Sequence, residues 1–267
     1  MTFRLIVLLS TALLVVTACS SGAPSASSAA GAPLTVFGAA SLGKVLDEVK
    51  VAYEAAVPGA VLTLSTDSSA ALATQITEGA PADVFLAADT TNPQKLVDGG
   101  LADGDAVVFA GNLLTIITPT DNPAGLTAPI DLGKSGVRVI AAGDEVPITK
   151  YATHLVENLA AAPGAPADFT AAYVANVASK EDNVAAVRTK IELGEGDGAI
   201  VYVTDAAASD KVATIDVPTD VNVPAGYVGV VVRASANVHA AHAFLDWFAG
   251  PGGQAILASS GFLPPAS

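Results

Sequence analysis

The sequence predicts an α/β fold of two lobes, each a mostly parallel sheet flanked by helices, with a ligand cleft between the lobes. Short apolar runs rich in Val and Ile alternate with segments whose apolar residues recur at helical spacing. Such alternation favours parallel strands joined by right-handed crossovers, and ligands of these sheets bind at the carboxyl ends of the strands. About ten strands are expected, which is wide for one open sheet and favours two lobes.

The expected elements follow one another along the chain from residue 34 onward. Strands are predicted at the apolar runs 34–37, 61–64, 83–87, 113–118, 137–141, 199–203 and 227–232. Helices are predicted at 42–53, around Leu72 and Ile76, at 149–161, at 183–193 and at 238–257, the last broken at Gly250-Pro251. Ser41 stands where the first helix needs an N-cap.

The chain is expected to cross between the lobes twice, near Gly111-Asn112 and again near 223–226. Lobe 1 would then comprise residues 34–112 plus 226–267, and lobe 2 would comprise residues 113–225. Phe244, Trp247 and Phe248 lie at helical spacing and are interpreted as part of the core of lobe 1.

The composition excludes several classes of protein. Of the 267 residues, 51% are apolar and 14% are charged, with 26 acidic against 12 basic side chains. The apolar fraction is too high for a disordered chain. A net charge of −14 argues against nucleic-acid binding, which needs clustered Lys and Arg. The one Cys can form neither an internal disulfide nor a thiolate metal cluster.

The first 33 residues are expected to export and tether the protein. Residues 1–18 are predicted to be a signal peptide, because Arg4 precedes an apolar run shorter than the roughly 20 residues of a membrane-spanning helix. Val16-Thr17-Ala18-Cys19 resembles the lipobox of bacterial lipoproteins, which implies lipid attachment at Cys19. A plain cleaved signal is the alternative. Residues 19–33 are rich in Ser, Ala, Gly and Pro and predict a flexible linker.

Hydroxyl-bearing or small residues recur where a strand passes into a helix. Ser41 and Ser68-Ser69 each follow a strand and precede a helix, and free N–H groups at a helix N-terminus beside a Ser hydroxyl can hold an anion. The alternative is that these serines are only N-caps, worth about 1 kcal/mol each. Residues 146–149 and 182–184 form further turns before helices, and Tyr202 ends a strand. Four such turns and a tyrosine begin to converge, and the residues alone leave both interpretations open.

Four segments resemble the molybdate-binding proteins (ModA) of ABC transporters. They are Ala39-Ala40-Ser41-Leu42, 68–76, Gly79-Ala80-Pro81-Ala82-Asp83-Val84-Phe85 and 198–206. The resemblance extends from residue 34 to residue 262 and implies a class II periplasmic binding protein that closes on a tetrahedral oxyanion. It implies high-affinity binding of molybdate, and also tungstate, with delivery to an ABC permease and its ATPase, without enzymatic activity or a cofactor.

The resemblance also implies the ligand contacts: two serine hydroxyls, one amide from each of two turns, and one tyrosine hydroxyl. Carried over by motif, these are Ser41, Ser69, Ile148, Val184 and Tyr202, with Ala40, Ser68 and Asn183 as additional candidates. Molybdenum enters only as the bound oxyanion. Ile148-Thr149 departs from the family, which commonly has Ala-Gly or Val-Gly after Val-Pro, and a slip of the second amide from Val184 to Asn183 stays open.

Other ligands and other classes of protein remain as alternatives. Sulfate or phosphate is the alternative oxyanion. A secreted hydrolase is disfavoured, because the chain has no Gly-x-Ser-x-Gly or His-Glu-x-x-His motif, and His239 and His242, three residues apart, are interpreted as surface residues of a helix. A scaffold lipoprotein without a ligand is the third possibility. The expected protein is an exported monomer, held by lipid at Cys19 on the outer face of the cytoplasmic membrane.

Overall fold

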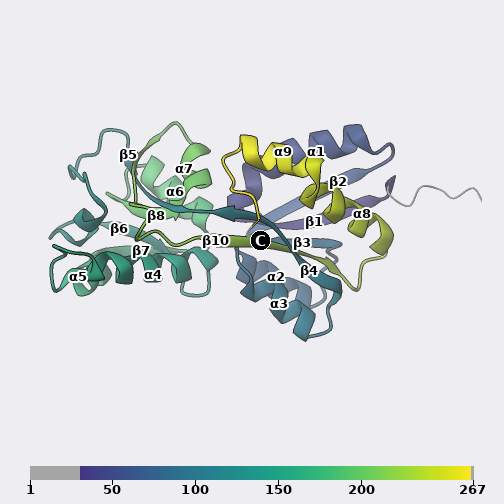
Figure 1. Cartoon of the computed structure of the whole chain (residues 1–267), viewed down its shortest axis with the longest axis horizontal. Helices are drawn as coiled ribbons and strands as arrows, with labels where there is room; N and C mark the ends of the chain where they lie inside the picture. Colours follow the sequence, from purple (N-terminus) through teal and green to yellow (C-terminus); the bar gives the residue numbers. More distant parts are fainter. Residues whose placement is uncertain (1–30, 266–267) are drawn as a thin grey trace, which may run out of the picture.

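Two lobes lie side by side in the computed structural model, which describes residues 31–265 (Figure 1). The first lobe contains a five-stranded sheet in the order β2-β1-β3-β10-β4. Its strands are β1 (Pro33–Ala39), β2 (Val61–Asp67), β3 (Val84–Ala87), β4 (Ala102–Asn112) and β10 (Ala225–Val232). Its helices are the 3₁₀ helix η2 (Ala40–Leu42), α1 (Gly43–Ala56), α2 (Ser69–Thr77), α3 (Thr91–Asp98), α8 (Val238–Ala249) and α9 (Pro251–Ser259).

The second lobe contains the remaining strands of the described chain. A three-stranded sheet has the order β8-β5-β9, and β6 pairs with β7. The strands are β5 (Leu114–Pro119), β6 (Val139–Ala142), β7 (Val177–Glu181), β8 (Ala199–Tyr202) and β9 (Val212–Ile215). The helices are η3 (Pro129–Gly133), α4 (Pro147–Ala161), α5 (Phe169–Asn176), α6 (Val184–Glu192) and α7 (Val203–Ala207). A parallel bridge between Val139 and Gly198 joins the two sheets.

The α/β fold of two lobes is confirmed, but the prediction of mostly parallel sheets is wrong. β1 is parallel to β2 and β3, whereas β10 is antiparallel to both β3 and β4. β5 is antiparallel to β8 and β9. The reason is that β4 leaves the first lobe and β10 returns to it, so that the two strands run in opposite directions, with Ala225 opposite Asn112. The expectation of parallel strands applies to neighbouring strands joined by one crossover helix. It does not apply to a strand that returns from another lobe.

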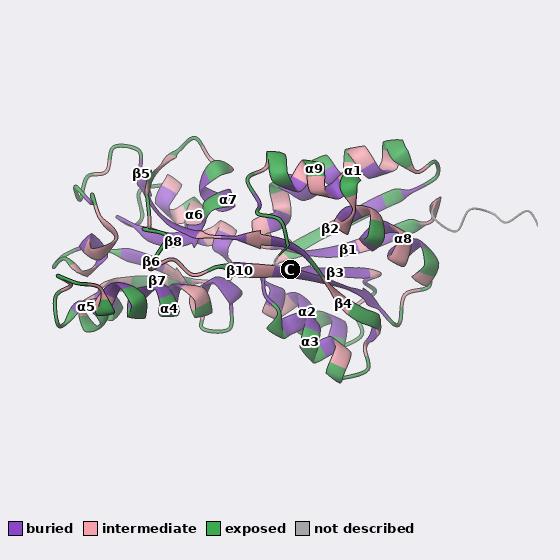
Figure 2. Cartoon of the chain, in the orientation of Figure 1, coloured by how far each residue is buried: buried purple, intermediate pink, exposed green. Residues whose placement is uncertain are grey.

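Helices cover both faces of the first-lobe sheet (Figure 1). α1, α8 and α9 pack on one face, and α2 and α3 pack on the other in a separate apolar cluster. Figure 2 shows the strands buried between these layers, while the outer faces of the helices are exposed. The alternation of side chains along β1 serves both faces, since Val36 belongs to one cluster and Phe37 to the other.

The predicted aromatic core of the first lobe is confirmed. Phe244 and Phe248 of α8 are fully buried, and Trp247 packs against the same cluster. The ring of Tyr53 on α1 meets Phe244 edge-on at a centroid distance of 5.0 Å, and it meets Trp247 at 5.1 Å. These contacts fix α8 on the last turn of α1.

Three predictions lie largely outside the described residues. The signal peptide at residues 1–18, the lipid attachment at Cys19 and most of the 19–33 linker stay predictions. Within residues 31–265, no helix combines the length and the hydropathy that a membrane crossing requires.

Candidate functional site

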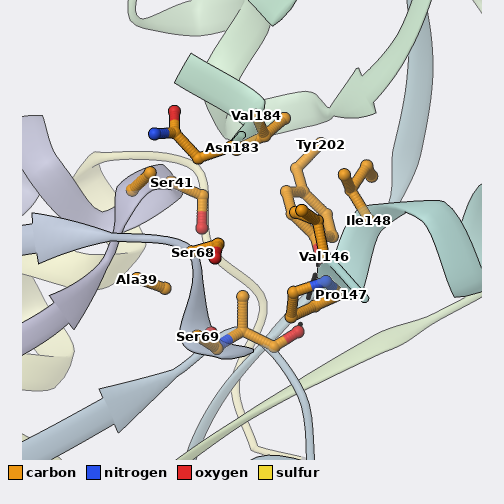
Figure 3. Close-up of a pocket in the computed structure, with 12 residues that line it drawn as sticks. Ala39, Ser41, Ser68, Ser69, Val146, Pro147, Ile148, Asn183, Val184 and Tyr202 are labelled. Atoms are coloured by element: carbon orange, nitrogen blue, oxygen red, sulfur yellow. Dashed lines mark hydrogen bonds between the residues drawn. The ribbon is translucent and has the colours of Figure 1, made fainter. Parts of the chain in front are cut away.

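A small pocket between the lobes is lined by all eight residues that the sequence singled out (Figure 3). It holds about 210 Å³ of empty space, against about 1560 and 1280 Å³ in the two neighbouring hollows that share some of its lining. The complete lining is Ala39, Ala40, Ser41, Ser68, Ser69, Ala88, Val146, Pro147, Ile148, Asn183, Val184 and Tyr202. No charged side chain is among them, so that any polar ligand must be held by neutral groups.

Ser41 reaches the pocket from the 3₁₀ turn η2 that follows β1. The prediction of Ser41 as an N-cap is wrong, because η2 intervenes and α1 begins only at Gly43, with no side chain capping it. The Oγ atom of Ser41 instead lies 2.9 Å from the hydroxyl oxygen of Tyr227 on β10. Its hydroxyl is therefore held by a tertiary contact and not by the helix that follows.

Ser68 and Ser69 enter the pocket at the turn between β2 and α2, where the two hydroxyls have different roles. Ser68 is the N-cap of α2, and its Oγ accepts a hydrogen bond from the N–H of Ala71 at 3.2 Å. Ser69 is the first residue of the helix and is 1% exposed, and its Oγ accepts from the N–H of Ala88 at 3.0 Å. Both oxygens thus receive a hydrogen from the backbone, which leaves each hydroxyl hydrogen available to donate.

The second lobe presents the beginning of α4 to the same pocket. Pro147 occupies the first position of α4, where the missing N–H costs nothing, and Ile148 follows it. N–H groups in the first turn have no carbonyl partner within the helix, so that the amide of Ile148 remains a donor. The hydroxyl of Thr149 donates to the carbonyl oxygens of Gly143 at 2.7 Å and Ala142 at 3.1 Å. Thr149, which stands where the family commonly has Gly, is therefore compatible with a regular start of α4.

The beginning of α6 lies beside the beginning of α4, and Val184 is the first residue of α6. Asn183 is the N-cap, and its Oδ1 accepts from the N–H of Ala186 at 3.0 Å. Its Nδ2 donates across the cleft to Oδ1 of Asp67 at 3.1 Å. Both ends of the Asn183 side chain are thus engaged, whereas the N–H of Val184 has no partner within the helix.

Tyr202 ends β8 and closes the pocket from the second lobe. It is 1% exposed, and its hydroxyl donates to the carbonyl oxygen of Ala88 in the first lobe at 3.4 Å. Burial raises the pKa of Tyr202 well above its ordinary value, so that the hydroxyl keeps its hydrogen at every physiological pH. The long bond to Ala88 leaves this hydroxyl free to turn toward a ligand.

The geometry suits an oxyanion better than a metal ion or a covalent reaction. Hydroxyls and helix-start amides converge from both lobes, and the positive ends of three helices favour negative charge. Within residues 31–265, no three side chains of His, Cys, Asp and Glu are placed to hold a metal ion. Nε2 of His242 lies 2.9 Å from Oδ2 of Asp103, far from the pocket in the fold, and His239 is exposed.

Comparison with known proteins places these observations in a family. Residues 34–263 match the family model described as bacterial extracellular solute-binding protein. The molybdate-binding protein ModA of Mycobacterium tuberculosis is 32% identical over 254 residues, covering 93% of this chain and 92% of that protein.

Two solved structures are similar in fold. The substrate-binding domain of a putative molybdenum ABC transporter from Clostridium difficile is 25% identical, covers 88% of this chain and 100% of that chain, and has a TM-score of 0.65. The sulfate-binding protein SubI from Mycobacterium tuberculosis is 22% identical, covers 87% of both chains, and has a TM-score of 0.77. The second likeness shows the fold alone.

Proposed function

Because the chain belongs to the family of bacterial extracellular solute-binding proteins, we propose that it captures molybdate, and also tungstate, for delivery to an ABC importer. The observation that carries the proposal is the convergence of neutral donors from both lobes on one small pocket. The proposed contacts are the hydroxyls of Ser41, Ser69 and Tyr202 and the amides of Ile148 and Val184. Ala40, Ser68 and Asn183 complete the wall around the anion.

Short-range donors must supply the affinity, because a chain with a net charge of −14 repels a dianion at long range. A hydrogen bond to a charged partner contributes about 1.5–3 kcal/mol, so that five such bonds supply about 7.5–15 kcal/mol toward the roughly 4–15 kcal/mol that association costs. The pocket walls offer hydrogens and no carboxylate. A phosphate that still carries a proton would find no carboxylate there to accept it, whereas molybdate and tungstate carry no proton at neutral pH.

Sulfate is the second candidate ligand, since the sulfate-binding protein shares the fold and sulfate is also an unprotonated dianion. Its S–O bonds are shorter than Mo–O bonds, so that donors held on two lobes would have to approach one another further to reach it. Size and protonation state together therefore favour molybdate over both competitors.

Isothermal titration of residues 20–267 with molybdate, tungstate, sulfate and phosphate tests the proposal. We expect one-to-one binding of the first two, at least about 100-fold tighter than sulfate or phosphate, equivalent to one charged hydrogen bond or more. Tighter binding of sulfate would keep the transport role and replace the ligand. Folded protein that binds none of the four anions would refute the proposal.

Removal of single hydroxyls tests the proposed contacts. Ser69→Ala and Tyr202→Phe are each expected to weaken molybdate binding about tenfold, through loss of one charged hydrogen bond. Ser209→Ala, at a half-buried serine outside the pocket, is the control and should bind as the unsubstituted protein does. Unchanged affinity of either pocket variant would remove that residue from the site.

We further propose that the lobes close around the anion by bending where β4 ends and β10 begins, near residues 112 and 225. This assigns residues 34–112 and 226–267 to lobe 1 and residues 113–225 to lobe 2. The protein would act as a monomer, held by lipid at Cys19 on the outer face of the membrane. Cys19→Ala should then release it from membranes into the soluble exported fraction, and retention on membranes would contradict the anchor.

A further inference from the structure

A chain of polar side chains runs through the buried region where the two lobes meet, and it ends at Ser41 in the pocket. Nδ2 of Asn112, at the end of β4, donates to Oγ1 of Thr204 on α7 at 2.8 Å. The same nitrogen lies 3.4 Å from the hydroxyl oxygen of Tyr227, which in turn lies 2.9 Å from Oγ of Ser41. Asn112, Thr204 and Tyr227 are all buried, and none of the three lines the pocket.

The orientation of the Asn112 side chain is fixed by its other end. Its Oδ1 accepts from the N–H of Leu113 at 3.0 Å, and a backbone N–H can only donate. The amide nitrogen must therefore face Thr204 and Tyr227. It follows that the hydroxyl oxygen of Tyr227 accepts a hydrogen from Asn112.

The hydrogen of the Tyr227 hydroxyl then has one acceptor among the described residues, which is Oγ of Ser41. Tyr227 is 0% exposed, and burial raises the pKa of its hydroxyl well above the ordinary value, so that this hydrogen is retained. If Ser41 donated instead, the buried hydrogen of Tyr227 would have no partner, which is unfavourable. Tyr227 thus donates to Ser41, and the hydrogen of Ser41 is directed to the pocket.

We propose that Tyr227 is a positioning residue for anion binding, which holds Ser41 as a hydrogen-bond donor through the chain Thr204–Asn112–Tyr227–Ser41. The inference rests on the proposed function, since it requires that Ser41 bind the oxyanion. Asn112 and Tyr227 lie on the two strands that connect the lobes, and Thr204 belongs to the second lobe. This series of hydrogen bonds therefore links Ser41, the donor in the first lobe, to the position of the second lobe.

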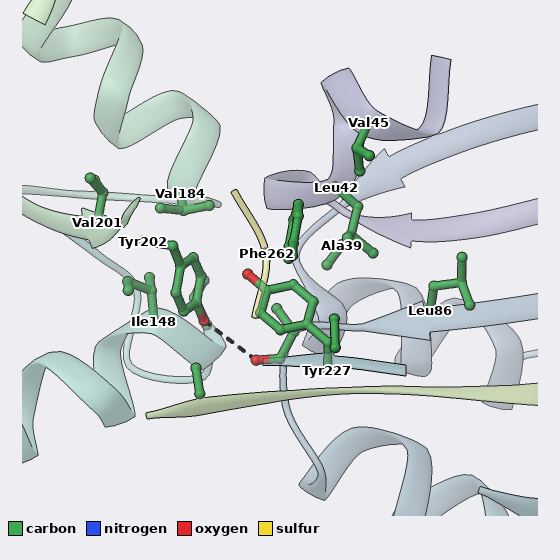
Figure 4. Close-up of a cluster of buried hydrophobic side chains, with 14 of the residues drawn as sticks. Ala39, Leu42, Val45, Leu86, Ile148, Val184, Val201, Tyr202, Tyr227 and Phe262 are labelled. Carbon is green, nitrogen blue, oxygen red and sulfur yellow. Dashed lines mark hydrogen bonds between the residues drawn. The ribbon is translucent and has the colours of Figure 1, made fainter. Parts of the chain in front are cut away.

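A purely structural role for Tyr227 is the competing explanation, because its ring packs in the core. The ring lies 5.3 Å from that of Phe262 and 5.6 Å from that of Tyr202, which Figure 4 shows beside it. Tyr227→Phe keeps these ring contacts and removes only the hydroxyl. Tyr53→Phe is a matched control, since Tyr53 is 1% exposed in the same lobe and its hydroxyl has no hydrogen-bond partner in the part of the chain that the structure describes.

The test is titration of molybdate into four proteins: the unsubstituted chain, Tyr227→Phe, Ser41→Ala and the double variant. We expect Tyr227→Phe to bind about fivefold to tenfold more weakly, because Ser41 loses its fixed donor geometry. Ser41→Ala should lose about tenfold or more, and the double variant should bind no more weakly than Ser41→Ala alone. Tyr53→Phe should bind as the unsubstituted chain does.

The outcomes separate this inference from the proposed function. If the unsubstituted chain binds no molybdate, the proposed function fails first. If it binds, then unchanged affinity in Tyr227→Phe, or losses that simply add in the double variant, would overturn the positioning role. Should Tyr227→Phe not fold, Asn112→Asp supplies a second test, because an ionised carboxylate would accept the Tyr227 hydrogen. Its affinity should then fall as the pH rises, and a pH profile parallel to that of the unsubstituted chain would refute the inference.

Discussion

Val184→Pro is expected to weaken molybdate binding about a hundredfold, the upper part of the range for one hydrogen bond to a charged group. Val184 is the first residue of α6, a position where proline is favoured because the helix makes no use of that N–H. Asn183 before it is extended, with φ −158° and ψ 169°, which a following proline tolerates. The substitution therefore removes the proposed donor without breaking the helix, and it places ring carbons where the anion would lie.

Val184→Ala is the matched control, because it keeps the N–H and changes only the side chain. Val184 is 4% exposed, so the alanine variant should melt at a lower temperature through loss of apolar contacts, while its affinity stays within about twofold because the donating N–H is kept. Calorimetric titration together with thermal unfolding separates the two effects. If Val184→Pro bound molybdate as tightly as Val184→Ala, the second-lobe donor would have to be another amide, and Asn183 would be the first to examine.

The candidate site could be predicted from the sequence because its parts are local. A strand end, one or two serines and a helix start lie within a few residues of one another, as in Ser68-Ser69 before α2. Such turns can be recognised wherever they occur, and the resemblance to a known family indicated which of them converge. The structure then brought Ser41, Ile148 and Tyr202 to one pocket, although they are far apart in the chain.

Tyr227 and Asn112 escaped prediction because their contacts are not local. Tyr227 bonds Ser41 across 186 residues, and Asn112 bonds Thr204 across 92. The only sequence signal was a hydroxyl or amide at the end of an apolar strand, which is also typical of ordinary half-buried residues. Such a signal indicates a contact with the site only once the pairing of the strands is known.

Several elements also escaped prediction, for a different physical reason. β4 carries Asp and Gly at its start, with Asp103, Gly104 and Asp105, which are unusual in strands. It nevertheless forms a long edge strand because β10 supplies its partner. β9 is four residues long, and α3, α5 and β7 are short and half-exposed, so that tertiary packing outweighs their weak local pattern.

Asp205→Asn is expected to stabilise the unliganded protein at pH 8 by an amount on the order of a few kcal/mol, and to have little effect near pH 4. Asp205 lies on α7, three residues after the proposed contact Tyr202, and is 1% exposed; among residues 31–265 its Oδ2 has no hydrogen-bond partner. Burial raises the pKa of its carboxyl from 3.8 to about 7, and the Arg188 guanidinium, 3.9 Å from Oδ1, offsets only part of this rise. The fold therefore favours the neutral form.

The sign of the effect follows from proton binding. Between pH 3.8 and about 7 the folded protein holds a proton that the unfolded chain has lost, so that stability falls as the pH rises through this window. Asparagine resembles the protonated carboxyl and does not ionise, which removes the penalty. Arg188 is not left unpaired, because its Nε also contacts Glu192 at 3.0 Å.

Thermal unfolding of both proteins from pH 4 to pH 9 measures this difference directly. The melting temperature of Asp205→Asn should rise above that of the unsubstituted protein progressively up to about pH 7 and then stay a constant interval above it. Asp210→Asn, at an exposed position of the same lobe, should show no such divergence. A variant less stable at every pH would instead mean that Asp205 is ionised and bound to Arg188. In that case a negative charge would stand behind Tyr202, and the pocket would have to bind its dianion against that charge as well.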